Sequence, residues 1–173
     1  MKKLIFWFTV TLLFAAIGHV STLLYFQFNL QSAAIAKISG QKPQNTLDLV
    51  ASVTAKSMFA PLVSPDISYG YCSYNISSNP LRVRIKLPPT YWSLAAYSQN
   101  GRNFYTINNQ QIKTDKLEIV FALEQQEAQL EEGTTIVRPP TETGLFLFRT
   151  FVPNRSLSEV VQAQMQETSC TPL

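Results

Sequence analysis

The sequence predicts a β-rich α+β protein: an N-terminal transmembrane helix followed by one antiparallel sheet or sandwich-like domain with short flanking helices. Two observations carry this prediction. Leu4–Phe28 contains no Asp, Glu, Lys or Arg, and the later chain holds short runs with period-two alternation, separated by turn residues. A parallel βαβ fold would need helical crossovers of about a dozen residues between strands, and the sequence shows no regular series of them.

The apolar run is long enough to cross a membrane, because a hydrocarbon core about 30 Å thick needs roughly 20 apolar helical residues. Lys2 and Lys3 precede the run and the next lysine is Lys37, so the positive-inside rule places the N-terminus in the cytoplasm. A cleaved signal peptide is the alternative. Its apolar core usually spans about 7–15 residues, and the nearest small-x-small site, Ala34–Ala36, lies late. An uncleaved anchor is therefore preferred.

Three regions are predicted. Residues 1–28 form the cytoplasmic tip and transmembrane helix, 29–65 a helical extension and linker, and 66–173 the outer β-rich domain. The alanine-rich start of the second region favours continuation of the helix as far as Gly40. Asn45 is then predicted to cap a short helix through Val50.

The predicted strands are half-buried alternating runs or nearly continuous apolar runs, each bounded by turn residues. They cover 67–76, 81–87, 91–97, 104–107, 117–123, 134–137 and 145–152. Asn100-Gly101 marks a hairpin, because a type I′ turn needs positive φ at both central residues. Short helices are predicted over 124–132, ended by Gly133, and from the capping box at Ser156 to about Thr168.

The two cysteines, Cys72 and Cys170, both fall on the predicted outer side of the membrane. An even pair in an oxidising compartment is most simply a disulfide. It would close a loop of about 100 residues, and in the chain-entropy model the closure of so long a loop strongly stabilises the folded state. Two free buried thiols are the alternative.

Charge and histidine content narrow the classes of function. With Lys2 and Lys3 on the inner side, twelve Lys and Arg face eleven acids in the rest of the chain, which is not the charge pattern of a nucleic-acid binder. His19, the only histidine, lies inside the apolar run, so the outer domain cannot assemble histidine-dependent catalytic or zinc sites. We expect no cofactor and no enzyme, although a carboxylate pair remains open.

Three groups of side chains are candidate contact residues. Arg82, Arg84 and Lys86 form a basic row on one strand face, suited to an anionic ligand or lipid headgroups, or simply to a solvated face that discourages edge pairing. Within the membrane helix, small and polar residues suggest a helix-packing face: Gly18, His19 and Thr22. An aromatic and asparagine group would line an apolar pocket or, more simply, form cross-strand pairs and core. Its members are Tyr91, Trp92, Tyr97, Asn103, Phe104 and Asn108.

Some of these residues recur in a family pattern. Tyr91-Trp92-Ser93-Leu94, Tyr97, Asn100-Gly101, Asn103-Phe104 and Ile107-Asn108 resemble the core hairpin of the domain-of-unknown-function 1254 family. Tyr71–Tyr74 followed by Leu81–Val83 is similar to the preceding strand pair in its small membrane-anchored members. The resemblance implies a bacterial envelope protein of unassigned function, here a single-pass inner-membrane protein with a periplasmic domain.

The same resemblance suggests a partner. Long relatives join this domain to a second one, of the 1214 family, in one chain, and short anchored members resemble one half of that arrangement. The leading hypothesis is therefore a structural or interaction module that docks another envelope protein. The partner would be a small anchored 1214-family protein, or a second copy of the chain. A small-ligand-binding domain is the alternative, and an enzyme ranks below both.

Overall fold

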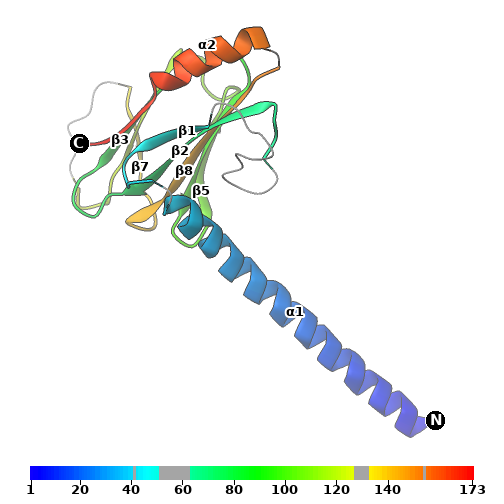
Figure 1. The fold of residues 1–173 in the computed structure, drawn as a ribbon. Coiled ribbons are helices and arrows are strands. Elements are labelled where there is room, and N and C mark those ends of the chain that lie inside the picture. The colour runs from blue at the N-terminus through cyan, green and yellow to red at the C-terminus, as the bar shows by residue number, and fades with distance from the viewer. Residues whose placement is uncertain (41, 51–62, 127–132, 154) are drawn as a thin grey trace.

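The computed structural model describes residues 1–40, 42–50, 63–126, 133–153 and 155–173. A long helix, α1 (Lys2–Ser39), leads into a sandwich of two sheets, and α2 (Arg155–Gln166) lies at the end of the sandwich opposite to α1 (Figure 1). The strands are β1 Leu47–Val50, β2 Ile67–Asn75, β3 Leu81–Lys86, β4 Trp92–Ser98, β5 Asn103–Asn108, β6 Lys116–Phe121, β7 Thr135–Val137, β8 Thr143–Phe151 and β9 Ser169–Pro172. The predicted β-rich α+β fold is confirmed.

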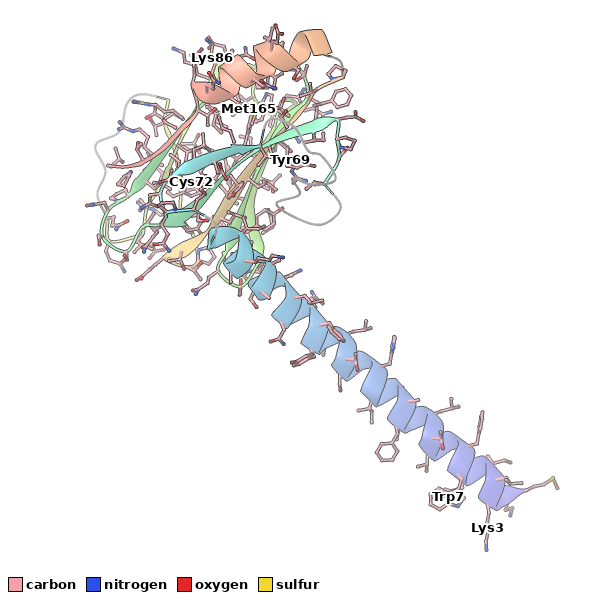
Figure 2. All side chains as sticks on the ribbon, in the orientation of Figure 1. Lys3, Trp7, Tyr69, Cys72, Lys86 and Met165 are labelled. Atoms are coloured by element: carbon pink, nitrogen blue, oxygen red, sulfur yellow. A yellow bond between two sulfur atoms is a disulfide. The ribbon has the colours of Figure 1, made fainter. Side chains whose placement is uncertain are left out.

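Helix α1 is one helix of 38 residues, long and apolar enough to cross a membrane, and its apolar side chains project freely (Figure 2). The Thr9 hydroxyl donates to the Ile5 carbonyl at 2.9 Å, so this polar group is hydrogen-bonded within the helix itself. Trp7 and Tyr25 lie about 27 Å apart along the axis at 1.5 Å per residue. That is close to the spacing of the two aromatic belts of a bilayer. The predicted extension beyond Phe28 is also helical, as far as Ser39.

Sheet A has the order β1-β2-β8-β4-β5 and is antiparallel throughout. Sheet B has the order β7-β6-β3-β9, in which only the short β6–β7 pair is parallel. The core lies between the sheets, because alternate residues such as Tyr74 of sheet A and Val83 and Ile119 of sheet B are fully buried in one cluster. Two faced sheets with alternating inward residues make a sandwich.

The disulfide joins the two sheets. Cys72 lies in β2 of sheet A and Cys170 in β9 of sheet B, with 6.6 Å between their Cα atoms. Both residues belong to the buried core, and Cys72 lies inside the sandwich in Figure 2. The predicted pairing is confirmed, and the alternative of free thiols is wrong. Helix α2 ends at Gln166, so Cys170 reaches the core from a short strand that the sequence did not predict.

The helix predicted through Val50 is wrong: Leu47–Val50 is β1, the edge strand of sheet A next to β2. Leu47 and Leu49 pack against the core, so the segment follows a period of two. The sheet therefore takes in part of the region predicted as extension and linker.

Asn45 fixes the start of this strand. It adopts φ +57°, a left-handed conformation that asparagine tolerates. Its backbone N–H donates to the Ser73 carbonyl at 2.7 Å. Its side-chain amide donates to the Asn75 carbonyl and accepts from the Asn75 N–H, each at 2.8 Å. Asn75 Nδ2 also donates to Gln44 Oε1 at 3.0 Å. We call these four bonds the Asn45 clamp.

Helix α2 differs slightly from its predicted bounds, and the helix predicted over 124–132 lies mostly outside the described residues. Helix α2 begins at Arg155, one residue before the predicted capping box. Of the helix predicted over 124–132, residues 127–132 lie outside the described residues, and Gln126 N–H closes a turn onto the Leu123 carbonyl at 3.0 Å. Gly133 has φ +89°, the left-handed conformation predicted for it.

Candidate functional site

The basic row of β3 lies opposite acidic partners that the sequence did not pair with it. Glu118, on the neighbouring strand β6, lies across from Arg84. Its carboxylate is 2.8 Å from Arg84 Nε and 3.1 Å from Arg82 Nε. Lys86 Nζ reaches Glu167, after α2, at 2.7 Å. When Lys116 on the neighbouring strand is counted with the row, Glu118 and Glu167 neutralise half of the positive charges of this face.

A shallow cavity of about 330 Å³ lies on this face, lined by Arg84, Lys86, Lys116 and Glu118 among others. Lys86 and Lys116 are direct cross-strand neighbours, an arrangement that is destabilising unless other charges compensate. Lys116 makes no ion pair within the described ranges. The face remains weakly positive and is built around internal ion pairs.

The aromatic and asparagine group divides between the core and the outside. Trp92 is 2% exposed and packs beside Phe148. Phe104 meets the rings of Tyr74 and Phe121 edge-on at 6.4 and 6.3 Å. Trp92 and Phe104 therefore belong to the sandwich core, and Trp92 is removed from the candidate contact surface. This outcome fits the simpler of the two sequence interpretations.

The remaining members of that group lie on or near β5. Tyr91, just before β4, is 48% exposed. Asn103 and Asn108 begin and end β5, and Tyr97 of β4 is the neighbour of Asn103. The structure thus brings Tyr97 and Asn103 together at one end of the β4–β5 hairpin, whereas Tyr91 and Asn108 lie near the other end.

Strand β5 is the edge strand of sheet A on the side opposite to β1, and it carries no charged residue. Asn109 N–H donates to the Trp92 carbonyl at 3.3 Å. Because antiparallel pairs alternate, the backbone groups of Ile107 point to β4 and those of Thr106 point away from the sheet. The Asn108 N–H is occupied by Gln111 Oε1 at 3.0 Å. Natural edges are usually protected by lysine, proline, a cover or a β-bulge. The β4–β5 pair has a bulge only at Ala96/Tyr97, so the part of β5 around Thr106 is a weakly protected edge.

A groove of about 490 Å³ separates the end of α1 from sheet A, and it was not predicted from the sequence. Its lining combines small, polar and apolar residues: Asn29, Ser32, Ala33, Ile35, Ala36 and Ser39 of α1, with Gln44, Ser73, Tyr74, Gln99, Thr143 and Gly144. The helix touches the domain at Gly101, where a Cβ would lie 2.5 Å from the Cβ of Gln31. The sequence contains one signal for this groove, because small residues recur at helical spacing after Asn29 and so share one face of the helix.

Buried tyrosines adjoin this region. Tyr74 is fully buried and its hydroxyl donates to the Tyr97 carbonyl at 3.3 Å. Burial raises the pKa of Tyr74 to about 12, opposed by a hydrogen bond with Thr141 that lowers it. Tyr71 donates to Asp48 Oδ2 at 2.7 Å. Burial, and then the hydrogen bond and charge of Asp48, also raise the pKa of Tyr71 above its ordinary value.

These shifts predict alkaline destabilisation. Above pH 10 an unfolded tyrosine loses its proton while buried Tyr74 keeps it up to about pH 12, so the unfolded state binds fewer protons and stability falls with pH. The free energy of unfolding, measured with urea between pH 9 and 11, should fall as pH rises. Tyr74→Phe should make the slope shallower, by up to about 1.4 kcal/mol per pH unit. An unchanged slope in that variant would contradict the assignment to Tyr74.

The proposed packing face of the membrane helix lies on exposed α1 residues. Thr22 Oγ1 donates to the Gly18 carbonyl at 2.8 Å, and a Cβ at Gly18 would meet nothing within 4 Å. His19 is adjacent to Gly18 and also exposed. The face is open in the single chain, and its use in helix packing stays a prediction. Within the described residues, no three His, Cys, Asp or Glu side chains gather as metal ligands.

Among the solved structures that resemble the chain are two uncharacterised bacterial proteins. The VPA0106 protein of Vibrio parahaemolyticus is 13% identical, with a TM-score of 0.68 over 86% of this chain and 36% of that one. An uncharacterized protein of Burkholderia cenocepacia is 14% identical, with a TM-score of 0.50 over 89% of this chain and 42% of that one. At such identity the likeness shows the fold alone. The chain covers less than half of the length of either protein.

The comparison by sequence gives a family. The family described as "Protein of unknown function (DUF1254)" matches residues 44–172. That range begins at Gln44, a member of the Asn45 clamp, and ends in β9, so it contains both sheets, α2 and the disulfide. No curated protein matches the chain.

Proposed function

Because the match covers well over half of its residues, the chain belongs to the DUF1254 family, and from that premise we propose that it is a membrane-anchored periplasmic module that docks another envelope protein. The anchor would be α1, with Lys2 and Lys3 in the cytoplasm. The buried disulfide supports an oxidising compartment for the domain. Protease added to intact spheroplasts should reach the domain; protection of the domain would contradict this orientation.

The observation that carries the docking proposal is the edge of β5. An uncharged strand at the end of a sheet presents backbone donors and acceptors that a partner strand can pair. Thr106 is exposed, and its outward backbone groups form no hydrogen bond within the described part of the chain. Asn103 and Asn108, at the two ends of β5, flank this position with polar side chains. Asn103 and Asn108 are also the two candidate contact residues of β5 that lie outside the core.

The partner follows from the family resemblance rather than from the fold. Long relatives of this domain carry a 1214-family domain in the same chain, which makes a small anchored protein of that family the proposed partner. Self-association through paired β5 edges is the second possibility. The lengths of the two solved structures agree with such an arrangement, because more than half of each chain lies outside the matched region.

Thr106→Pro tests the edge. Proline at 106 removes the outward N–H without removing a hydrogen bond to β4, and proline is tolerated at sheet edges. The full chain would be co-expressed with a tagged small anchored 1214-family protein from the same cell and purified in mild detergent. Co-elution is expected for the natural chain and at least tenfold less for Thr106→Pro.

Thr106→Val is the matched control, because it also loses the hydroxyl that donates to Asn103 Oδ1 at 3.0 Å but keeps the backbone N–H. It should co-elute as the natural chain does. Light scattering distinguishes a 1214-family partner from a second copy of the chain. A homodimer of the natural chain that becomes a monomer in Thr106→Pro would identify self-association. A lone monomer for the natural chain in both experiments would overturn the docking proposal.

The alternative, a small-ligand-binding domain with an aromatic-lined pocket, has weaker support. Tyr74, Phe104 and Phe121 pack against one another and fill the interior. A ligand would have to use the groove beside α1, in whose lining Tyr74 is the one aromatic residue among the described residues. Native mass spectrometry that finds a small molecule retained by the purified chain would favour this alternative, and an unliganded mass would count against it.

A further inference from the structure

The tip of the β4–β5 hairpin is seated on the outer part of α1. Gly101 adopts φ +81°, and a Cβ at this position would lie 2.5 Å from the Cβ and 3.0 Å from the carbonyl carbon of Gln31. Only glycine allows both the backbone conformation and the close approach. The hairpin tip therefore has a fixed height along the helix, and that height is set by Gln31.

The position of Gln31 can be related to the bilayer. Gln31 lies three residues beyond Phe28, the end of the apolar run, which is about 4–5 Å along the axis at 1.5 Å per residue. The headgroup layer on each side of a bilayer extends about 5–8 Å beyond the hydrocarbon. If α1 spans the membrane, the hairpin tip lies at headgroup depth.

The hairpin tip presents one charge at this height. Arg102 is exposed and is the only charged residue between Ser98 and Asn103. Its guanidinium makes no ion pair or hydrogen bond with the rest of the described chain. Glu142, the nearest acid along the neighbouring loop before β8, does not pair with it.

The backbone that carries Arg102 is well fixed. The Arg102 N–H donates to Asn100 Oδ1 at 3.3 Å and its carbonyl accepts from the Ser98 N–H at 3.0 Å. The Gly101 N–H donates to the Ser98 carbonyl at 2.8 Å. A positively charged, unpaired side chain is thus held on a rigid turn beside the emerging helix, where lipid phosphates would surround it.

We propose that the 98–103 hairpin rests on the outer surface of the bilayer that α1 crosses, and that the Arg102 guanidinium binds phospholipid phosphate. Arginine suits this role because its planar donors match phosphate oxygens in pairs. The contact would fix the height and orientation of the domain above the membrane. The inference rests on the anchor in the proposed function, but not on the docking of a partner.

Solid-state NMR measures this contact directly. The full chain, with ¹³C in its arginine Cζ atoms, would be reconstituted in phosphatidylcholine vesicles containing about one third phosphatidylglycerol, in phosphate-free buffer. Carbon–phosphorus dipolar recoupling should attenuate about one sixth of the arginine signal, because Arg102 is one of six arginines. Arg102→Gln should abolish the attenuation. Arg84→Gln, a control at an arginine paired with Glu118, should retain it.

Each outcome decides a different point. Attenuation that persists in Arg102→Gln, or no attenuation in the natural chain, would overturn the headgroup contact. An alkaline wash of the same vesicles reports on the anchor. A chain retained through the wash without attenuation would refute the contact alone, and a chain that the wash removes would refute the anchor and the contact together.

Discussion

Loss of the Cys72–Cys170 disulfide should lower the free energy of unfolding by about 4 kcal/mol, because the bond closes a loop of about 100 residues in the unfolded chain. It also joins β2 of sheet A to β9 of sheet B across a buried core. β9 has only four residues, so few other contacts would hold it in place. Urea unfolding of the full chain in detergent, comparing the natural chain with Cys72→Ala/Cys170→Ala, measures the effect.

Reduction provides the matched control. Dithiothreitol should shift the unfolding midpoint of the natural chain by a similar amount and leave the double variant unchanged. Alanine fills most of the space of a half-cystine, so the cavity contribution stays small. A shift below about 1 kcal/mol would show that the unfolded chain retains structure near the crosslink.

Phe121→Ala should lower the free energy of unfolding by about 3–5 kcal/mol, the range for a buried phenylalanine truncated to alanine. Its ring stacks between Tyr74 at 5.6 Å and Phe146 at 6.4 Å, and it meets Phe104 edge-on. Phe121 belongs to sheet B whereas these three rings come from sheet A. The ring thus joins the inner faces of the two sheets at the end of the core.

Phe121→Leu is the conservative comparison, since it keeps most of the apolar volume and should cost less than about 1.5 kcal/mol. Urea unfolding gives both values. Domains are typically stable by only about 5–15 kcal/mol, so Phe121→Ala should also speed proteolysis by raising the population of the opened chain. Equal stability of the alanine and leucine variants would contradict a tightly packed aromatic stack.

Local sequence signals predicted the elements that carry strong periodicity or composition. The apolar run gives α1, and the alternation of Leu81, Val83 and Ile85 with basic residues gives β3. Asn100-Gly101 marks the β4–β5 turn, with Gly101 at φ +81°, but Asn100 does not have the positive φ that the predicted type I′ turn requires. The two cysteines gave the crosslink because an even pair outside the membrane has one simple pairing.

Features that depend on contacts between distant segments were missed. Leu47–Val50 is too short to show its period, and its strand conformation depends on pairing with β2 and on Asn45. Glu118 neutralises the basic row because of the β3–β6 register, which no local pattern specifies. The groove beside α1 arises where an outer helical turn meets a hairpin tip some seventy residues later.

The Asn45 clamp has a mechanical consequence for a tethered domain. If α1 is anchored, tension on it reaches the sandwich at the start of β1, where the Asn45 clamp lies (Figure 1). The clamp binds to the end of β2, the strand that also carries Cys72. Force is thereby passed directly into the crosslinked centre of the fold.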